Sequence, residues 1–135
     1  MKASLTNYRQ SPRKVRLIAD LISGKSVERA DTELMFLTKR GALPFRKLLQ
    51  SAVANAKTNF DVDAKNLIVS SVRVDKGVVL KRMMPRARGS ASRIHKRTSH
   101  IVLTLKEGET KKSKKEKAVV AEKKVTPKKE KATKK

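Results

Sequence analysis

The chain is 135 residues long and carries 35 Lys and Arg against 12 Asp and Glu, so its formal net charge at pH 7 is +23. This length suits one domain with an appendage, and this charge predicts a polyanionic partner, of which nucleic acid is the first candidate. The absence of cysteine excludes a disulfide framework and a Cys-based zinc site. The chain has no run of about 18 apolar residues, the length needed to span a membrane, and we expect a soluble cytoplasmic protein.

The residues before position 25 predict a strand and a helix. Residues 2–8 are short and mixed, which favours an edge strand. Ser11 and Pro12 are residue types preferred as the N-cap and first residue of a helix, and Gly24 suits the end of that helix. Between them the apolar residues recur at helical spacing: Val15, Ile18, Ala19 and Ile22.

Two more helices are predicted before Asp61. Ser26 is a suitable cap for the first of them, which runs through Leu37. Gly41 then separates it from a third helix whose apolar residues follow the i, i+3, i+4, i+7 spacing of one buried face. These residues are Phe45, Leu48, Leu49, Ala52, Val53 and Ala56. We expect the larger ones, Val53 included, to lie in the core.

After Asp61 the spacing of the apolar residues becomes typical of strands. Residues 67–74 and 101–105 are predicted as strands. Between them Pro85 cannot donate a ladder hydrogen bond and Gly89 permits an unusual turn, so the simplest connection is one long antiparallel hairpin. We place this hairpin at about 76–98, with its tip near 85–92. Because a two-stranded ribbon is marginal in water, we expect its base to pack on the helices and its outer part to need a partner.

Residues 76–106 contain no Asp or Glu. Their nine Lys and Arg are Lys76, Lys81, Arg82, Arg86, Arg88, Arg93, Lys96, Arg97 and Lys106. A solvated, charge-rich loop is the simpler alternative, but solubility alone would tolerate both signs of charge. The like charges of these residues repel one another. The phosphates of a nucleic acid would offset that repulsion, with release of condensed counterions. The hairpin also lacks Phe, Tyr and Trp, which favours recognition of phosphates and folded shape over base stacking.

The first turn of the first predicted helix is also basic. Arg13, Lys14 and Arg16 follow Pro12 closely, although cations near a helix N-terminus oppose the helix dipole. The arrangement is favourable if an external phosphate lies between these side chains and the exposed N–H groups. The alternative is a capped helix whose basic first turn is simply solvated.

Catalysis and metal binding are not predicted. His95 and His100 are the only histidines, and their surroundings lack the carboxylate, Cys or further His partners that a metal or a general base would need. We expect His100 to be structural, and we predict no cofactor and no enzyme activity. Residues 107–135 are of low complexity, rich in Lys and poor in large apolar residues, and we predict a disordered tail.

Five segments in order resemble one known family. They are Ser11-Pro-Arg-Lys-Val-Arg-Leu-Ile-Ala-Asp-Leu-Ile22, Gly24-Lys25, Lys47-Leu-Leu-Gln-Ser-Ala-Val-Ala-Asn-Ala-Lys57, Leu80-Lys-Arg-Met-Met-Pro-Arg-Ala-Arg-Gly89 and Arg97-Thr-Ser-His-Ile101. Over about residues 3–106 the chain is similar to the large-subunit ribosomal protein L-twenty-two family of bacterial type. The resemblance implies an α+β fold, with three helices packed on a three-stranded antiparallel sheet and a long protruding basic hairpin. We therefore expect one RNA-binding domain at 1–106, followed by the tail.

The resemblance also implies a function. It predicts a structural constituent of the large ribosomal subunit that binds large-subunit ribosomal RNA and cross-links distant RNA segments during assembly. Its hairpin tip would line the nascent-peptide exit tunnel. The implied partners are ribosomal RNA, neighbouring ribosomal proteins and the nascent polypeptide, with no membrane and no homo-oligomer. Val78 stands where family members often have Pro, and Ser90 stands where a basic residue is usual.

The candidate site residues form two overlapping sets. The RNA-binding set is Arg9, Arg13, Lys14, Arg16, Lys25, Lys76, Lys81, Arg82, Arg86, Arg88, Arg93, Lys96 and Arg97. The tunnel-lining tip is Lys81, Arg82, Met83, Met84, Pro85, Arg86, Ala87, Arg88, Gly89 and Ser90.

A DNA-binding architectural protein of the histone-like nucleoid type is the alternative. Such proteins also combine helices with basic β-ribbon arms, and an apolar wedge near the tip kinks the minor groove. Pro85 could act as that wedge. The predicted strand before the first helix, the basic first turn and the order of the segments favour the ribosomal alternative.

Overall fold

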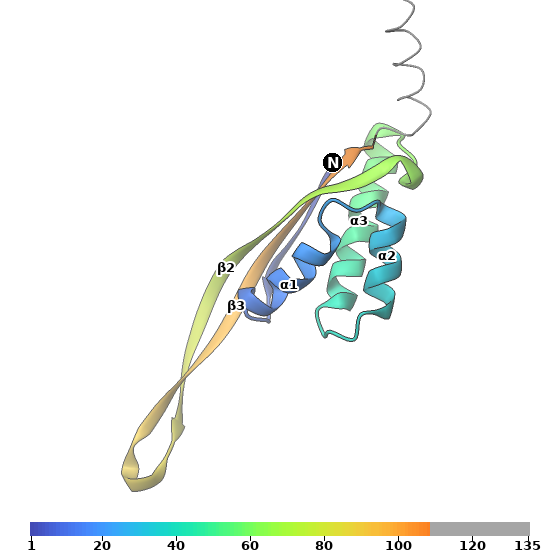
Figure 1. Cartoon of the computed structure of the whole chain (residues 1–135). Coiled ribbons are helices and arrows are strands. Elements are labelled where there is room, and N and C mark those ends of the chain that lie inside the picture. Colours follow the sequence, from blue (N-terminus) through green and yellow to red (C-terminus); the bar gives the residue numbers. More distant parts are fainter. Residues whose placement is uncertain (109–135) are drawn as a thin grey trace, which may run out of the picture.

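The computed structural model describes residues 1–108 and has the predicted α+β fold. Three helices pack on a three-stranded antiparallel sheet of order β1-β3-β2 (Figure 1). The elements are β1 (Lys2–Tyr8), α1 (Pro12–Ile22), α2 (Val27–Phe36), α3 (Ala42–Phe60), the 3-10 turn η1 (Ala64–Asn66), β2 (Leu67–Pro85), the 3-10 turn η2 (Ala87–Gly89) and β3 (Ala91–Glu107). Of the predicted tail, only residues 107 and 108 are described. None of the described helices is long and apolar enough to cross a membrane.

The central strand β3 holds the sheet together. It pairs with β1 on one side and with β2 on the other, so the predicted edge strand at residues 2–8 is confirmed. Its alternating residues Ile101, Leu103 and Leu105 are fully buried and face the helices, as the spacing of a half-covered strand requires. The strand extends through Glu107, and the Gly108 N–H donates to the Asn66 carbonyl at 2.6 Å.

Beyond the helices, β2 and β3 continue alone as a long two-stranded ribbon (Figure 1). We call residues 76–98 the arm and the other described residues the body. The pairing runs unbroken from Val79 opposite Arg97 to Pro85 opposite Ala91, which confirms the predicted hairpin and its tip. All residues from Leu80 to Ala91 are exposed, so the outer arm has no core of its own.

The helices bury the faces that the sequence predicts. In α1 the buried residues include Val15, Ile18, Ala19 and Ile22, and in α3 they include Phe45, Leu48, Leu49, Ala52 and Ala56. Ser11 is the N-cap residue of α1 and Pro12 is its first residue, although the Ser11 side chain makes no capping hydrogen bond. The loop after α1 is fixed to the sheet, because the Gly24 N–H donates to the Val69 carbonyl at 2.8 Å and the Val69 N–H donates to the Lys25 carbonyl at 2.9 Å.

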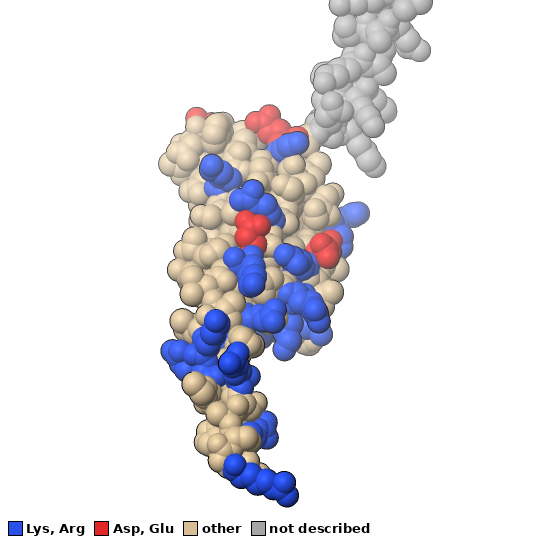
Figure 2. Space-filling model, turned by 90° about the vertical axis from the view of Figure 1, so that its left-hand side faces the viewer, with Lys and Arg blue, Asp and Glu red and all other residues tan. Residues whose placement is uncertain are grey.

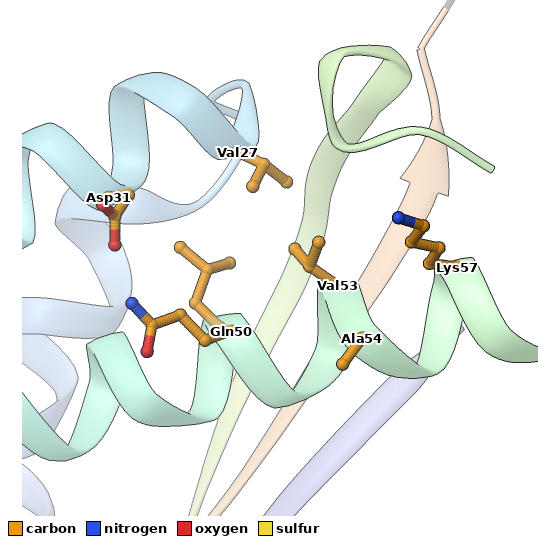
Figure 3. A pocket seen from close by; sticks show the side chains of 7 residues that line it. Val27, Asp31, Gln50, Val53, Ala54 and Lys57 are labelled. Carbon is orange, nitrogen blue, oxygen red and sulfur yellow. The ribbon is translucent and has the colours of Figure 1, made fainter.

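One core residue was predicted wrongly. Val53 is only half-buried, because α2 does not cover this part of α3 completely. The side chain borders a shallow, mostly apolar pocket of about 320 Å³ between the two helices, with Asp31 and Lys57 among its lining residues (Figure 3). The i, i+3, i+4 spacing marks a face of the helix, and it does not show where the covering helix ends.

Candidate nucleic-acid interface

The arm presents its basic side chains to solvent without compensating carboxylates. Its cations are all exposed, and they are Lys76, Lys81, Arg82, Arg86, Arg88, Arg93, Lys96 and Arg97. Within residues 1–108 the ion pairs are Lys25–Glu33, Arg46–Asp31 and Arg73–Asp75, so none lies on the arm. In Figure 2 the charged side chains of the arm are all basic, and the acidic ones lie on the body. The basic residues predicted for the hairpin therefore lie together on a single projecting element.

The base of the arm contains a built-in irregularity. The β2–β3 register shifts between Lys76 and Val79, and the Thr98 hydroxyl donates to the Val78 carbonyl at 2.7 Å inside this bulge. Gly77 is required there, because a Cβ at this position would lie 2.5 Å from the Thr98 Oγ1. Val78 lies within the bulge. Since β-bulges bend and twist a ribbon, this joint sets the direction of the arm.

The N-terminal segment supports the same joint from the other side. Arg9 Nη1 donates to the Arg97 carbonyl at 2.8 Å, and the buried Ser99 hydroxyl donates to the Gln10 carbonyl at 2.7 Å. His100 Nδ1 accepts a hydrogen bond of 3.1 Å from the Asn7 N–H, which makes this histidine structural, as predicted. One guanidinium nitrogen of Arg9 therefore binds the backbone of the arm, while the side chain as a whole remains exposed.

The tip is a tight, exposed turn with an unexpected conformation. The Arg86 N–H donates to the Ser90 carbonyl at 2.8 Å, and the Ser90 N–H and hydroxyl both reach the Ala87 carbonyl, at 3.3 and 3.0 Å. Gly89 has a φ of 69°, as a glycine turn predicts, but Arg88 has a φ of 58°. Left-handed backbone disfavours a side chain such as that of Arg88, so this turn holds some strain. Ser90, where the family usually has a basic residue, closes the turn.

The basic residues of α1 divide into free and engaged groups. Arg13 and Lys14 are exposed in a first helical turn that has no acidic residue, which is the arrangement predicted to receive a phosphate. Arg16 Nη2 instead donates to the Val74 carbonyl of β2 at 3.2 Å. Arg16 thus joins α1 to the strand that becomes the arm.

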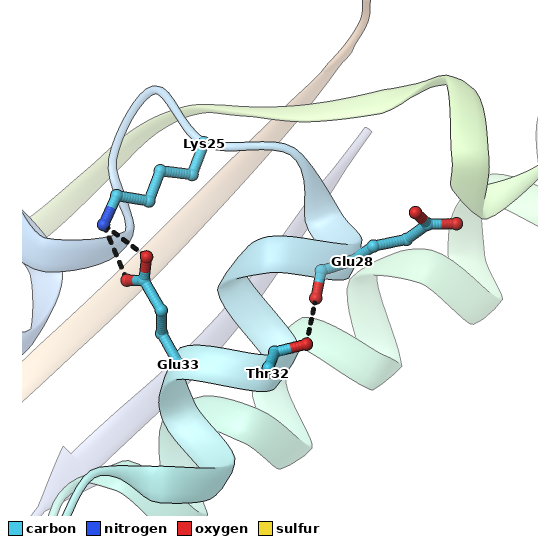
Figure 4. A network of polar contacts seen from close by, with 4 residues as sticks. All are labelled: Lys25, Glu28, Thr32 and Glu33. Carbon is cyan, nitrogen blue, oxygen red and sulfur yellow. Dashed lines mark hydrogen bonds and ion pairs between the residues drawn. The ribbon is translucent and has the colours of Figure 1, made fainter.

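Lys25 is the predicted site residue whose charge is most fully satisfied by the protein itself. Its Nζ lies 2.6 Å from both carboxylate oxygens of Glu33, as Figure 4 shows. A second basic residue of the body is engaged in the same way, since Arg46 Nε and Nη2 donate to Asp31 at 2.9 and 3.2 Å. This hydrogen bonding, and then the attraction of the Asp31 charge, raise the pKa of Arg46 above its ordinary value. These cations stabilise contacts within the body, and they are weaker candidates for RNA than those of the arm.

Two of the exposed cations outside the predicted set are adjacent in the chain. Lys39 and Arg40 lie exposed in the turn between α2 and α3, at the end of the body from which the arm projects (Figure 1). Adjacent basic residues in an inter-helix turn could have indicated them, but such pairs are common on solvated turns. Among residues 1–108, no three His, Cys, Asp or Glu side chains gather into a group that could hold a metal ion.

The sequence of this chain is similar to those of known proteins. The family described as "Ribosomal protein L22p/L17e" matches residues 3–106. A "Large ribosomal subunit protein uL22" of Herpetosiphon aurantiacus is 47% identical over 108 residues, covering 80% of this chain and 96% of its own length. One of the same name from Pediococcus pentosaceus is 48% identical over 106 residues, covering 78% and 90%. The chain belongs to the family Ribosomal protein L22p/L17e.

Proposed function

We propose that this protein is a structural constituent of the large subunit of the cytoplasmic ribosome and that it binds large-subunit ribosomal RNA. Membership of the family supports this assignment, as do the relatives, which are named as large-subunit proteins. Neighbouring ribosomal proteins are its other partners in the subunit. The protein acts through binding and shape, and we assign it no catalytic step.

The observation that carries this proposal is the arm. An isolated two-stranded ribbon is marginal in water, and this one adds repulsion among exposed cations that no carboxylate offsets. A polyanion on both sides of the ribbon would supply the missing counter-charge. An arm inserted between RNA segments contacts more than one of them at once. It can therefore cross-link segments that are distant in the RNA sequence while the subunit assembles.

The tip of the arm, from Lys81 to Ser90, is assigned to the wall of the nascent-peptide exit tunnel. The family resemblance is the source of this assignment, and the geometry is compatible with it. Arg86 and Arg88 place two exposed guanidinium groups around a fixed turn, where they can hold phosphates in bidentate fashion. Met83 and Met84 are 77% and 47% exposed and offer an apolar surface to a passing polypeptide.

Salt dependence of RNA binding tests the proposal. If roughly six phosphates are contacted, the logarithm of the affinity for large-subunit ribosomal RNA should fall with the logarithm of salt concentration at a slope of about −4 to −5. Duplex DNA of matched length serves as the comparison, because a nucleoid protein would prefer it. A slope near zero on the RNA, or failure to cosediment with large subunits in high salt, would reject the proposed function.

A further inference from the structure

The turn between α2 and α3 exposes an apolar group beside its two cations. Met35, Phe36 and Leu43 are 63%, 76% and 63% exposed. Lys39 and Arg40 lie between them in sequence and take part in none of the ion pairs of the described chain. We call these five residues the turn surface. A single exposed apolar side chain is ordinary, whereas here Met35 and Leu43 line one hollow together with Lys39 and Arg40, and Phe36 follows Met35 at the end of α2. Such a grouping of exposed apolar side chains and cations indicates a surface that contacts a partner.

The turn surface is held in place by the body. A hollow of about 260 Å³ opens in it, with Met35, Leu43 and Arg40 among the lining residues. Gly41, the N-cap residue of α3, is buried so closely against α1 that a Cβ there would lie 2.5 Å from the Ile18 Cδ1. A partner would therefore meet a surface that is already formed, which lowers the entropy cost of binding.

The position of the turn indicates what the partner is. It lies at the end of the body from which the arm projects (Figure 1). The far end of α3 carries charges of both signs, with Lys57 and Lys65 beside Asp61 and Asp63. If the arm enters folded RNA, the end of the body that carries the turn surface faces the RNA. Lys39 and Arg40 complement the charge of phosphates at that boundary.

We propose that the turn surface docks a segment of large-subunit ribosomal RNA that carries one unstacked base. The base stacks on Phe36, Met35 and Leu43 extend the apolar contact, and Lys39 and Arg40 hold the flanking phosphates. This inference rests on the proposed function and adds a mode of recognition to it. The arm has no aromatic ring and binds through charge, whereas the turn surface also offers a ring to a base.

Replacement of the aromatic ring tests the stacking contact. The full-length protein is bound to large-subunit ribosomal RNA freed of protein, and affinity is measured by filter binding over a range of KCl concentrations. Phe36→Ala should weaken binding by about 5-fold to 150-fold, the range measured for loss of one stacked base, and should leave the salt slope unchanged. Phe60→Ala is the matched control, because Phe60 is 58% exposed at the opposite end of α3. It should bind like wild type.

Replacement of the cations tests the phosphate contacts. Lys39→Gln combined with Arg40→Gln should make the salt slope shallower by roughly 1.5 to 2, which corresponds to two lost phosphate contacts. Lys57→Gln combined with Lys65→Gln removes the same net charge from two exposed residues near the other end of α3. This control pair should leave the slope within error of the wild-type value, which separates a local contact from a general effect of net charge.

The outcomes distinguish this inference from the function on which it rests. A wild-type slope near zero would reject RNA binding by the whole protein. A steep wild-type slope, with Phe36→Ala and the Lys39/Arg40 pair both binding like wild type, would reject the turn surface alone. If those variants bind bare RNA normally but leave assembled subunits more readily in high salt, the turn surface contacts a protein, and the RNA assignment is wrong.

Discussion

The body and the arm differ in where their interactions are completed. In the body, Phe45, Leu49 and Leu103 are fully buried, and Lys25 and Arg46 are paired with carboxylates of the same chain. In the arm, every charged side chain is a cation, and the apolar residues Leu80 and Met83 are 42% and 77% exposed. The chain therefore encodes a body that can be stable alone and an arm whose contacts are left for a partner.

The largest effect should follow from a charge placed in the core of the body. Leu49 is 1% exposed, so Leu49→Asp forces an unpaired carboxylate into an apolar interior. We expect a loss of about 4 kcal/mol or more, which is most of the stability of a domain at the low end of the ordinary range of about 5–15 kcal/mol. Leu80→Asp makes the same chemical change on the arm and should leave the thermal unfolding midpoint of the free protein nearly unchanged. Equal midpoints for Leu49→Asp and wild type would show that the buried face of α3 is assigned wrongly.

The arm should show the reverse behaviour, with a large effect on binding and little on folding. Arg86→Gln combined with Arg88→Gln removes two exposed guanidinium groups from the tip. We expect the salt slope of RNA binding to become shallower by roughly 1.5, with no change in thermal unfolding. Lys25→Gln is the contrasting variant, because the charge of Lys25 is already offset by Glu33 at 2.6 Å. If Lys25→Gln changes the slope as much as the loss of one tip arginine, the distinction between paired and free cations fails.

The joint between the two regions should give an intermediate effect on stability. Gly77→Ala would place a Cβ 2.5 Å from the Thr98 Oγ1, where that hydroxyl donates to the Val78 carbonyl. We expect a loss of about 1–3 kcal/mol, the usual range for overpacking, together with faster amide exchange around the bulge. In a Thr98→Ala background the additional cost of Gly77→Ala should shrink, because the nearest clashing atom is absent. If Gly77→Ala costs as much in the Thr98→Ala background as in the wild type, the strain arises from other atoms of the joint.

The parts of the fold that were predictable from sequence are those set by local periodicity. The buried faces of α1 and α3, the edge strand and the hairpin each follow from residue spacing or turn chemistry within one segment. The features that the sequence did not predict are set by tertiary contacts. Lys25 is neutralised by Glu33 across an inter-helix loop, Arg16 holds the Val74 carbonyl, and Val53 lies where α2 fails to cover α3. Residue type and spacing do not predict such contacts between segments.

Conformation at the tip was likewise beyond sequence reasoning. Gly89 indicated a left-handed residue in the turn, and the structure has one there. The preceding Arg88 is also left-handed, a conformation that its residue type disfavours. It is held by the hydrogen bonds that Ser90 makes to Ala87 and that Arg86 makes to Ser90. The turn thus depends on a set of bonds that only the closed hairpin can form.

The smallest effect on the fold, and the most specific effect on function, should come from moving the tip. Leu80, Lys81 and Arg82 are exposed and pair with Lys96, His95 and Ile94. Deleting 80–82 alone removes an odd number of residues from one strand, which inverts the facing of everything between the deletion and the turn. Deleting 94–96 as well shortens both strands equally, so the pairing register is kept and the tip moves back by about 10 Å, with both of its strands turned over together. Neither deletion removes a core residue, so the free body should unfold at the wild-type temperature.

We expect large subunits that carry either deletion to assemble, because neither deletion touches the RNA contacts proposed for α1 and the base of the arm. If the tip lines the exit tunnel, both deletions should change the response of translation to macrolides that bind there. The one-sided deletion should also change the positions at which nascent peptides stall, because it displaces the guanidinium groups of Arg86 and Arg88 sideways. Ribosome profiling with and without a macrolide measures both responses. An unchanged profile, in ribosomes confirmed to contain the shortened proteins, would remove the tip from the tunnel wall while leaving the basic arm as an RNA-binding element.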